Sequence, residues 1–152
     1  MDPPVTLPAL DLFSLKGQNV LITGATRGIG AACALALAEA GASICLVQRH
    51  ASDGAEPNLE TYNAIKAYIK NKASEQAVEV VYCDLDNLDE VKGLFDKGLE
   101  VMPGKEINVL VNCAGIQRRA PAVDFPEHDW DEVSSESICI SPVYVMFLET
   151  GR

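Results

Sequence analysis

The sequence is poor in basic residues. Its 152 residues include 12 Lys and Arg against 22 Asp and Glu, which gives a formal net charge of −10. Nucleic acids and anionic membranes are bound by basic surfaces, so this balance argues against both as the main partner. The largest apolar run, residues 138–148, is too short to span a bilayer and contains Pro142. The start, Met1-Asp2-Pro3-Pro4, lacks basic residues before an apolar stretch, so we expect no secretory signal.

The sequence also lacks paired cysteines. It contains no Cys-x-x-Cys, and its two histidines, His50 and His128, lie near no pair of cysteines. These absences argue against a zinc site, so no metal ligands are assigned. We expect buried free thiols in a reducing compartment, which favours the cytoplasm. The five cysteines are Cys33, Cys45, Cys83, Cys113 and Cys139.

The most informative segment is the glycine run Thr23-Gly24-Ala25-Thr26-Arg27-Gly28-Ile29-Gly30. It follows a short apolar stretch typical of a buried strand and precedes an alanine-rich stretch typical of a helix. Unpaired backbone N–H groups and the helix dipole make such a turn an anion site. The pyrophosphate of a nucleotide is the expected ligand.

The three glycines have separate expected roles, as in dinucleotide-binding turns. Gly24 allows the tight turn, Gly28 lets phosphates approach the backbone, and Gly30 permits close packing of the helix on the sheet. The spacing is four then two, rather than that of G-x-G-x-x-G, and an ordinary strand–helix turn is the alternative. A Walker-type phosphate loop is excluded because no Gly-Lys-Ser/Thr follows.

Strand and helix patterns alternate along the chain. Residue patterns predict strands at 18–23, 43–47, 78–82 and 107–111, and helices at 28–40, 59–72 and from about 88 to Pro103-Gly104. Gly41 is the expected stop of the first helix, and Asp86 or Asn87 the expected cap of the third. The inner face of the third helix is predicted to comprise Leu88, Val91, Leu94, Phe95 and Leu99.

This alternation predicts an α/β fold, a partial Rossmann-type parallel sheet of about four strands with helices on both faces. Residues 1–17 are a lead-in, 18–133 the dinucleotide-binding domain and 134–152 a divergent tail. Ligands of such sheets bind beyond the carboxyl ends of the strands.

Polar residues at two of these strand ends indicate how adenosine is bound. Asp84 follows the third strand and can accept a hydrogen bond from the adenine amine; a helix cap or turn role is the alternative.

An acid after the second strand would bind the ribose 2′-hydroxyl of NAD. Gln48 and Arg49 stand there instead. Arg49 and Arg27 can flank a 2′-phosphate, so NADP(H) is favoured over NAD(H), although Arg49 as a solvated loop charge stays possible.

The sequence resembles the short-chain dehydrogenase/reductase family in three motifs. These are the glycine run, Asp84-Leu85, and Asn112-Cys113-Ala114-Gly115 after the fourth strand. Cys113 departs from the usual second asparagine. The resemblance extends from about Phe13 to Val133. It implies an NAD(P)-dependent oxidoreductase whose cofactor-binding residues are Gly24, Thr26, Arg27, Gly28, Ile29, Gly30, Arg49, Asp84, Leu85, Asn112, Ala114 and Gly115.

Residues 114–119 and the segment around Asp129-Trp130-Asp131-Glu132-Val133 resemble the sugar-acid dehydrogenases, which oxidise gluconate or 2-deoxygluconate or reduce the keto forms. Arg118 and Arg119 can bind a substrate carboxylate; packing on the following helix or exposure to water is the alternative.

The catalytic Tyr-x-x-x-Lys pair of that family is missing, and so is its upstream serine. Tyr62-x-x-x-Lys66 has the right spacing but lies on the second predicted helix, so no catalytic residue is assigned. We expect the family pattern to end after Val133, without the later strands and the helices that form the family's usual subunit interface. We expect a truncated chain with an open sheet edge, an aggregation-prone tail and no turnover alone. A non-catalytic dinucleotide-binding module or a degraded product is the alternative.

Overall fold

The computed structural model describes residues 8, 11–52 and 55–134. Its strands are β1 (Asn19–Thr23), β2 (Ser43–Gln48), β3 (Val78–Tyr82) and β4 (Val109–Val111), and its helices are α1 (Gly28–Glu39), α2 (Glu60–Lys72) and α3 (Leu88–Val101). Short 3-10 turns span Asp11–Phe13, Pro103–Lys105 and Ala122–Asp124. Among these residues, no helix has both the length and the apolar character of a membrane span. The expected properties of the tail concern residues 135–152, which lie outside the described part.

The strands form one parallel sheet in the order β3-β2-β1-β4. This arrangement confirms the predicted α/β fold with a Rossmann-type sheet. The chain moves outward from β1 to β3 and then returns to the other side of β1, so the strand order reverses between β1 and β4. Ile22 of β1 pairs with Val111 of β4 and with Leu46 of β2, which brings the carboxyl ends of three strands to one edge. A reversal of this kind is where doubly wound sheets bind ligands.

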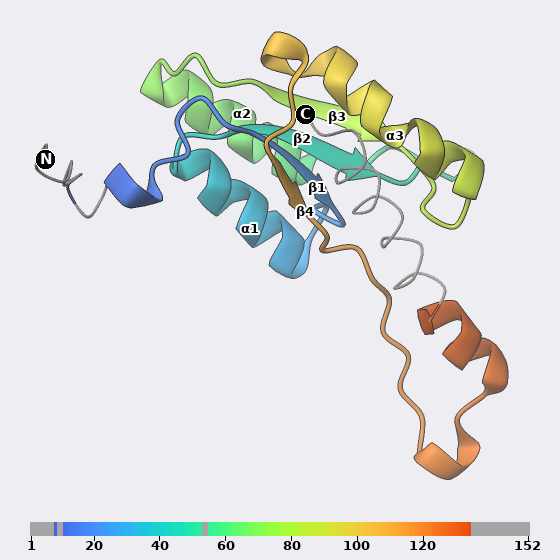
Figure 1. The fold of residues 1–152 in the computed structure, drawn as a ribbon. Coiled ribbons are helices and arrows are strands. Elements are labelled where there is room, and N and C mark those ends of the chain that lie inside the picture. The colour runs from blue at the N-terminus through green and yellow to red at the C-terminus, as the bar shows by residue number, and fades with distance from the viewer. Residues whose placement is uncertain (1–7, 9–10, 53–54, 135–152) are drawn as a thin grey trace, which may run out of the picture.

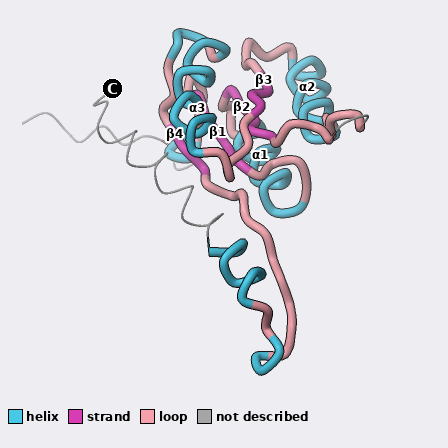
Figure 2. The backbone as a smooth tube through the Cα atoms, turned by 90° about the vertical axis from the view of Figure 1, so that its right-hand side faces the viewer, coloured by secondary structure: helices cyan, strands magenta, loops and turns pink. Residues whose placement is uncertain are grey.

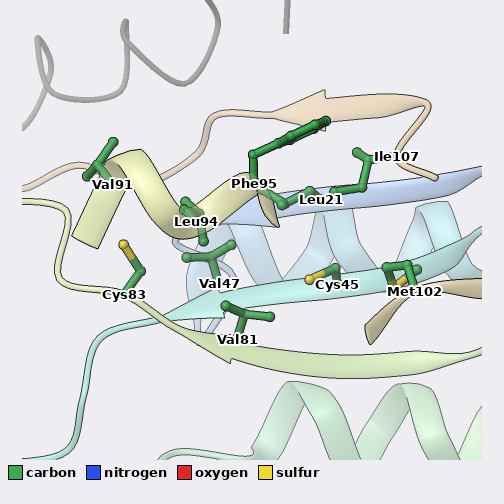
Figure 3. Close-up of a cluster of buried hydrophobic side chains, with 10 residues drawn as sticks. All are labelled: Leu21, Cys45, Val47, Val81, Cys83, Val91, Leu94, Phe95, Met102 and Ile107. Carbon is green, nitrogen blue, oxygen red and sulfur yellow. The ribbon is translucent and has the colours of Figure 1, made fainter. Parts of the chain in front are cut away.

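Helices cover both faces of the sheet (Figure 1). Alternate residues of β1 and β2 point to opposite faces, since successive side chains of a strand alternate. One set packs against α1 and α2 through Ala34, Ala38 and Ile65. The other set packs under α3 in the cluster drawn in Figure 3, in which Val91, Leu94 and Phe95 of the helix lie over the strands. The two cores leave β1 and β2 buried along their whole length.

Local capping chemistry sets the ends of the helices. Gly41 has φ 107°, and the N–H of Ala42 donates to the carbonyl of Leu37 over 3.1 Å, so Gly41 ends α1 as predicted. The side chain of Asn87 accepts from the N–H of Asp89 over 3.1 Å and caps α3, which decides between the two predicted caps. Leu88, predicted on the inner face of α3, is 54% exposed, so that expectation is wrong.

The strand boundaries differ slightly from the prediction. β2 continues one residue further, to Gln48, because Gln48 pairs with Tyr82 of β3. β4 is shorter than expected and pairs only with β1, so it is an edge strand of the described sheet, as predicted. After β4 the chain leaves the sheet and runs outward to the helical residues 127–134, an excursion visible in Figures 1 and 2.

Candidate functional site

A crevice of about 450 Å³ lies at the carboxyl ends of the strands, above the reversal point between β1 and β4. All the predicted cofactor-binding residues line it except Asp84 and Asn112. Val47, Gln48, Cys83, Cys113 and Ile116 also line it and were not predicted. The glycine turn, the end of β2 and the segment after β4 therefore form one concave site, as the strand-end rule predicts.

The glycine turn shapes the floor of this crevice. Gly24 has φ 66°, and a Cβ on it would lie 2.5 Å from the backbone N and Cα of Ala114, so the turn touches the segment after β4. Gly28 has φ 60°, but a Cβ there would meet no atom within 4 Å. A Cβ on Gly30 would clash with the carbonyl oxygen of Gly24, so Gly30 lets the start of α1 approach the turn that follows β1.

The first turn of α1 offers unsatisfied donors to an anion. The first N–H of α1 that bonds within the helix belongs to Ala31, which donates to the carbonyl of Arg27 over 3.3 Å. Arg27 is the N-cap residue and makes no side-chain capping bond, and the first turn holds no acidic residue. Backbone N–H groups at a helix start with open space beside Gly28 fit a phosphate group.

Two further groups hold the turn in place, and neither was predicted. The hydroxyl oxygen of Thr23 accepts from the N–H groups of Cys113 and Ala114, over 3.2 and 3.1 Å, and so ties the end of β1 to the end of β4. The carbonyl of Thr26 accepts from the side chains of Asn58 and Thr61, each over 3.4 Å. Only the fold reveals these partners, because they lie far along the chain from the turn.

Arg49 lies just after β2, on the side of the crevice where adenosine is predicted to bind, and it forms ion pairs with two carboxylates. Its Nε lies 3.4 Å from Oδ1 of Asp84, and a terminal nitrogen lies 3.0 Å from Oδ2 of Asp86. The structure thus brings together the predicted phosphate-binding arginine and the predicted adenine-binding aspartate. Both roles remain predictions.

An additional contact beside this pair was not predicted from the sequence. Nε2 of His50 lies 3.2 Å from Oε2 of Glu90, and the His50 ring stacks on Tyr82. The N–H of Asp84 donates to Glu90 over 2.9 Å. This backbone hydrogen bond, followed by contacts with His50, lowers the pKa of Glu90, so the carboxylate is charged near neutral pH. The loops after β2 and β3 are joined by these contacts.

The two arginines predicted to bind substrate lie outside the crevice. Arg118 donates to Glu132 through Nε and a terminal nitrogen, over 3.0 and 2.9 Å, and so packs on the helical residues 127–134. Arg119 donates to the side chain of Gln117 over 3.1 Å. Arg118 therefore packs on the following helix, which was the alternative to a substrate role. A role in substrate binding remains a prediction for both arginines.

A larger cavity of about 910 Å³ lies at the opposite, amino-terminal ends of the strands, between Lys16, Glu39, Gln76 and Glu106. It has no glycine turn at a helix start and is lined by helix carboxyl ends, which repel anions. We therefore assign the functional site to the smaller crevice.

The buried thiols give a direct test of the core around the site. Burial raises the pKa of Cys83 to about 11, with nearby Glu90 adding to the rise, and raises that of Cys45 to about 12. At pH 8 the thiolate fraction is then about 1 in 1,000 for Cys83 and about 1 in 10,000 for Cys45. We expect iodoacetamide to alkylate both in urea but neither in the native protein, as read by peptide mass spectrometry. Native labelling of Cys83 as fast as that of half-buried Cys33 would contradict this.

A comparison of the sequence with protein-family models supports the assignment of the crevice as a nucleotide site. The model for short chain dehydrogenases matches residues 18–145. The chain belongs to the short-chain dehydrogenase family. The match extends beyond Val133, where the sequence resemblance was expected to end. This family binds NAD or NADP, which accords with the glycine turn and the crevice above it.

The short-chain dehydrogenases most similar to the chain include sugar-acid enzymes. Gluconate 5-dehydrogenase of Gluconobacter oxydans (strain 621H) is 36% identical over 130 residues, which are 84% of this chain and 45% of that protein. The crystal structure of a gluconate 5-dehydrogenase from Burkholderia cenocepacia J2315 in complex with NADP and tartrate is 32% identical, with a TM-score of 0.68 over 87% of this chain and 47% of that one.

A second solved structure is described as a putative 2-deoxy-D-gluconate 3-dehydrogenase from Agrobacterium tumefaciens with bound NADP. It is 34% identical, with a TM-score of 0.67 over 92% of this chain and 51% of that one. The chain spans about half the length of the curated relatives that it matches. The resemblance to sugar-acid dehydrogenases is thereby confirmed.

Proposed function

We propose that the chain is the nucleotide-binding part of an NAD(P)-dependent oxidoreductase acting on a sugar acid or a similar alcohol or ketone. The observation that carries this is the open space over Gly28 at the start of α1, within a crevice at the reversal point of the sheet. When bound there, the dinucleotide supplies the hydride or accepts it. The residues of the chain bind its phosphates and adenosine.

NADP(H) is the favoured cofactor. No acid stands at the end of β2 to repel a 2′-phosphate, and Arg27 and Arg49 line the crevice. Arg49 is held by Asp84 and Asp86, but these ion pairs are about half exposed. Such pairs contribute at most about 1 kcal/mol, so a phosphate carrying about two charges can displace them. The two similar structures described with NADP support the same choice.

Turnover requires an acid–base group, and the residues that the structure describes place no tyrosine–lysine pair at the crevice. Nζ of Lys66 donates to the hydroxyl of Tyr62 over 3.1 Å on α2; Lys66 is exposed, Tyr62 is half-buried, and neither lines the crevice. The pair with the family spacing is thus a surface helix pair. We propose that the chain binds the dinucleotide without turning over substrate alone, which is also the property of a non-catalytic binding module. The buried thiols of Cys45 and Cys83 favour a reducing compartment such as the cytoplasm.

The test is calorimetric titration of the 152-residue chain with NADPH and with NADH. We expect saturable binding of both, tighter for NADPH. No binding of either would refute the nucleotide-binding function, and tighter binding of NADH would refute only the cofactor preference. Steady oxidation of NADPH in the presence of keto-gluconates would refute the proposed lack of turnover.

A further inference from the structure

Two of the four cysteines in the described part of the chain lie side by side next to the nucleotide crevice. Cys33 belongs to α1 and Cys113 follows β4, so the two are far apart in sequence. Both are half-buried, and both pack against the hydrophobic cluster that α1 forms with the sheet. A side-chain hydrogen bond joins their thiols. The fold therefore builds a dithiol from two cysteines that the sequence separates.

Close backbone contacts hold the two cysteines together. A Cβ on Gly30 would clash with the carbonyl oxygen of Gly24, and one on Gly24 would lie 2.8 Å from the carbonyl carbon of Cys113. The N–H of Cys113 also donates to the hydroxyl of Thr23 over 3.2 Å. Cys33 lies three residues after Gly30 on α1, and residues at that spacing share one face of a helix. This face of α1 is therefore turned towards the end of β4.

The other two described cysteines have a different environment. Cys45 and Cys83 are fully buried in the cluster under α3, and burial is the main cause that raises their pKa values to about 12 and about 11. The thiolate is the reactive form of cysteine, so both are inert in the native protein. Cys113, in contrast, is partly exposed and lines the crevice, so a small molecule in the crevice reaches the dithiol.

The hydrogen bond between the thiols gives the two sulfurs different roles. Burial raises the pKa of Cys113, and the charge of Cys33 and the hydrogen bond to Cys33 raise it further. Cys113 therefore keeps its proton and donates it in a hydrogen bond to the sulfur of Cys33. Because a thiolate is the nucleophile in oxidation, the first attack comes from Cys33, and the Cys113 thiol is placed to react second.

We propose that Cys33 and Cys113 form a site of reversible oxidation, at which hydrogen peroxide converts the dithiol into a disulfide between α1 and the end of β4. The Cys33 thiolate attacks one peroxide oxygen, the O–O bond breaks, and hydroxide leaves and is protonated by solvent. The Cys113 sulfur then attacks the sulfenic acid on Cys33. The S–S bond forms, the S–O bond breaks, and the Cys113 proton leaves with the oxygen as water. The two thiols lose two electrons, which the peroxide gains.

The disulfide fastens β4 to α1. In the described sheet β4 pairs only with β1, so its attachment is otherwise limited to one side. Since the thiols already meet, the bond forms by rotation of two side chains. It closes a loop of about 80 residues, and a link of this kind stabilises a protein mainly by restricting its unfolded state. In a reducing compartment the disulfide is transient, so the fastening is reversible.

The test is oxidation of the native 152-residue chain with hydrogen peroxide, followed by alkylation and peptide mass spectrometry. We expect Cys33 and Cys113 to form one linked pair of peptides, and Cys45 and Cys83 to stay reduced. The melting temperature should rise by about 5–15 °C on oxidation and return when dithiothreitol is added. Unlinked Cys33 and Cys113 peptides, or links from either to another cysteine, would refute the site. A chain that binds no dinucleotide can still form this disulfide, so the result is independent of the proposed function.

Serine variants test the order of the two steps. Cys113→Ser leaves the sulfenic acid of Cys33 without its partner, so dimedone should label Cys33 at least about tenfold more than in the unmodified chain. Cys33→Ser should leave Cys113 largely reduced, because the thiol holds its proton. Cys139→Ser, which changes a cysteine outside the described residues, is the control and should form the same linked pair. Equal labelling of Cys33 with and without Cys113 would refute the second step.

Discussion

Replacing Gly24 with alanine is expected to lower the free energy of unfolding by about 2–5 kcal/mol. The substitution places a side chain at φ 66°, which costs about 1–2 kcal/mol, and forces its Cβ to 2.5 Å from the backbone of Ala114. Overpacking of this kind costs about 1–3 kcal/mol more, because backbone atoms cannot turn away as a flexible side chain can. Urea denaturation followed by circular dichroism measures the loss.

Gly28→Ala is the matched control for this prediction. Gly28 has almost the same φ, 60°, but nothing lies within 4 Å of the added Cβ. We expect only the conformational cost of about 1–2 kcal/mol. Equal losses for the two variants would contradict the close contact between the glycine turn and the segment after β4.

Gly28→Val is expected to weaken NADPH binding at least about a hundredfold while the protein stays folded. The valine side chain fills the open space beside the first N–H groups of α1, where the geometry fits a phosphate. A loss of this size corresponds to about 2.7 kcal/mol, which is comparable to losing a charge-assisted hydrogen bond or two. Calorimetric titration measures the affinity, and thermal unfolding checks that the variant is folded.

Gly104→Val separates this loss from backbone strain. Gly104 also has a positive φ, 67°, and open space around it, but it lies in the turn after α3 at the far end of the sheet. The Gly104→Val variant should lose about as much stability as Gly28→Val but keep the affinity of the unmodified chain for NADPH. An equal loss of affinity in both variants would show that strain, rather than the filled phosphate site, weakens binding.

Local chemistry made much of the fold predictable. A strand pattern, a glycine turn and an alanine-rich stretch define β1 and α1 without distant information, and Gly41 ends α1 because only the left-handed conformation of that residue closes the helix. Asn87 was predictable as a cap of α3 for a similarly local reason, because its side chain can accept from the N–H of Asp89 two residues along the chain. The order of the elements then places the carboxyl ends of the strands, and with them the crevice.

The unpredicted features depend on residues far apart in sequence. Arg49 meets Asp86 only because the loops after β2 and β3 end side by side, and Arg118 meets Glu132 across a turn of the chain. Leu88 has the correct helical phase but stands at the first residue of α3, ahead of the cluster that begins at Val91. Gln48 looks like a loop residue in sequence, since polarity at a strand end usually means exposure.

The bond pattern around Thr23 has a consequence for the order of folding. Its hydroxyl holds Cys113, which is 90 residues away in sequence, whereas β1, α1, β2, α2 and β3 are each close to their neighbours along the chain. Closing so long a loop is slow and entropically expensive, so β4 is expected to dock last and to release first in hydrogen exchange. The glycine turn and residues 113–116 both line the crevice, so we expect a dinucleotide bound there to contact both segments and to slow the release of β4.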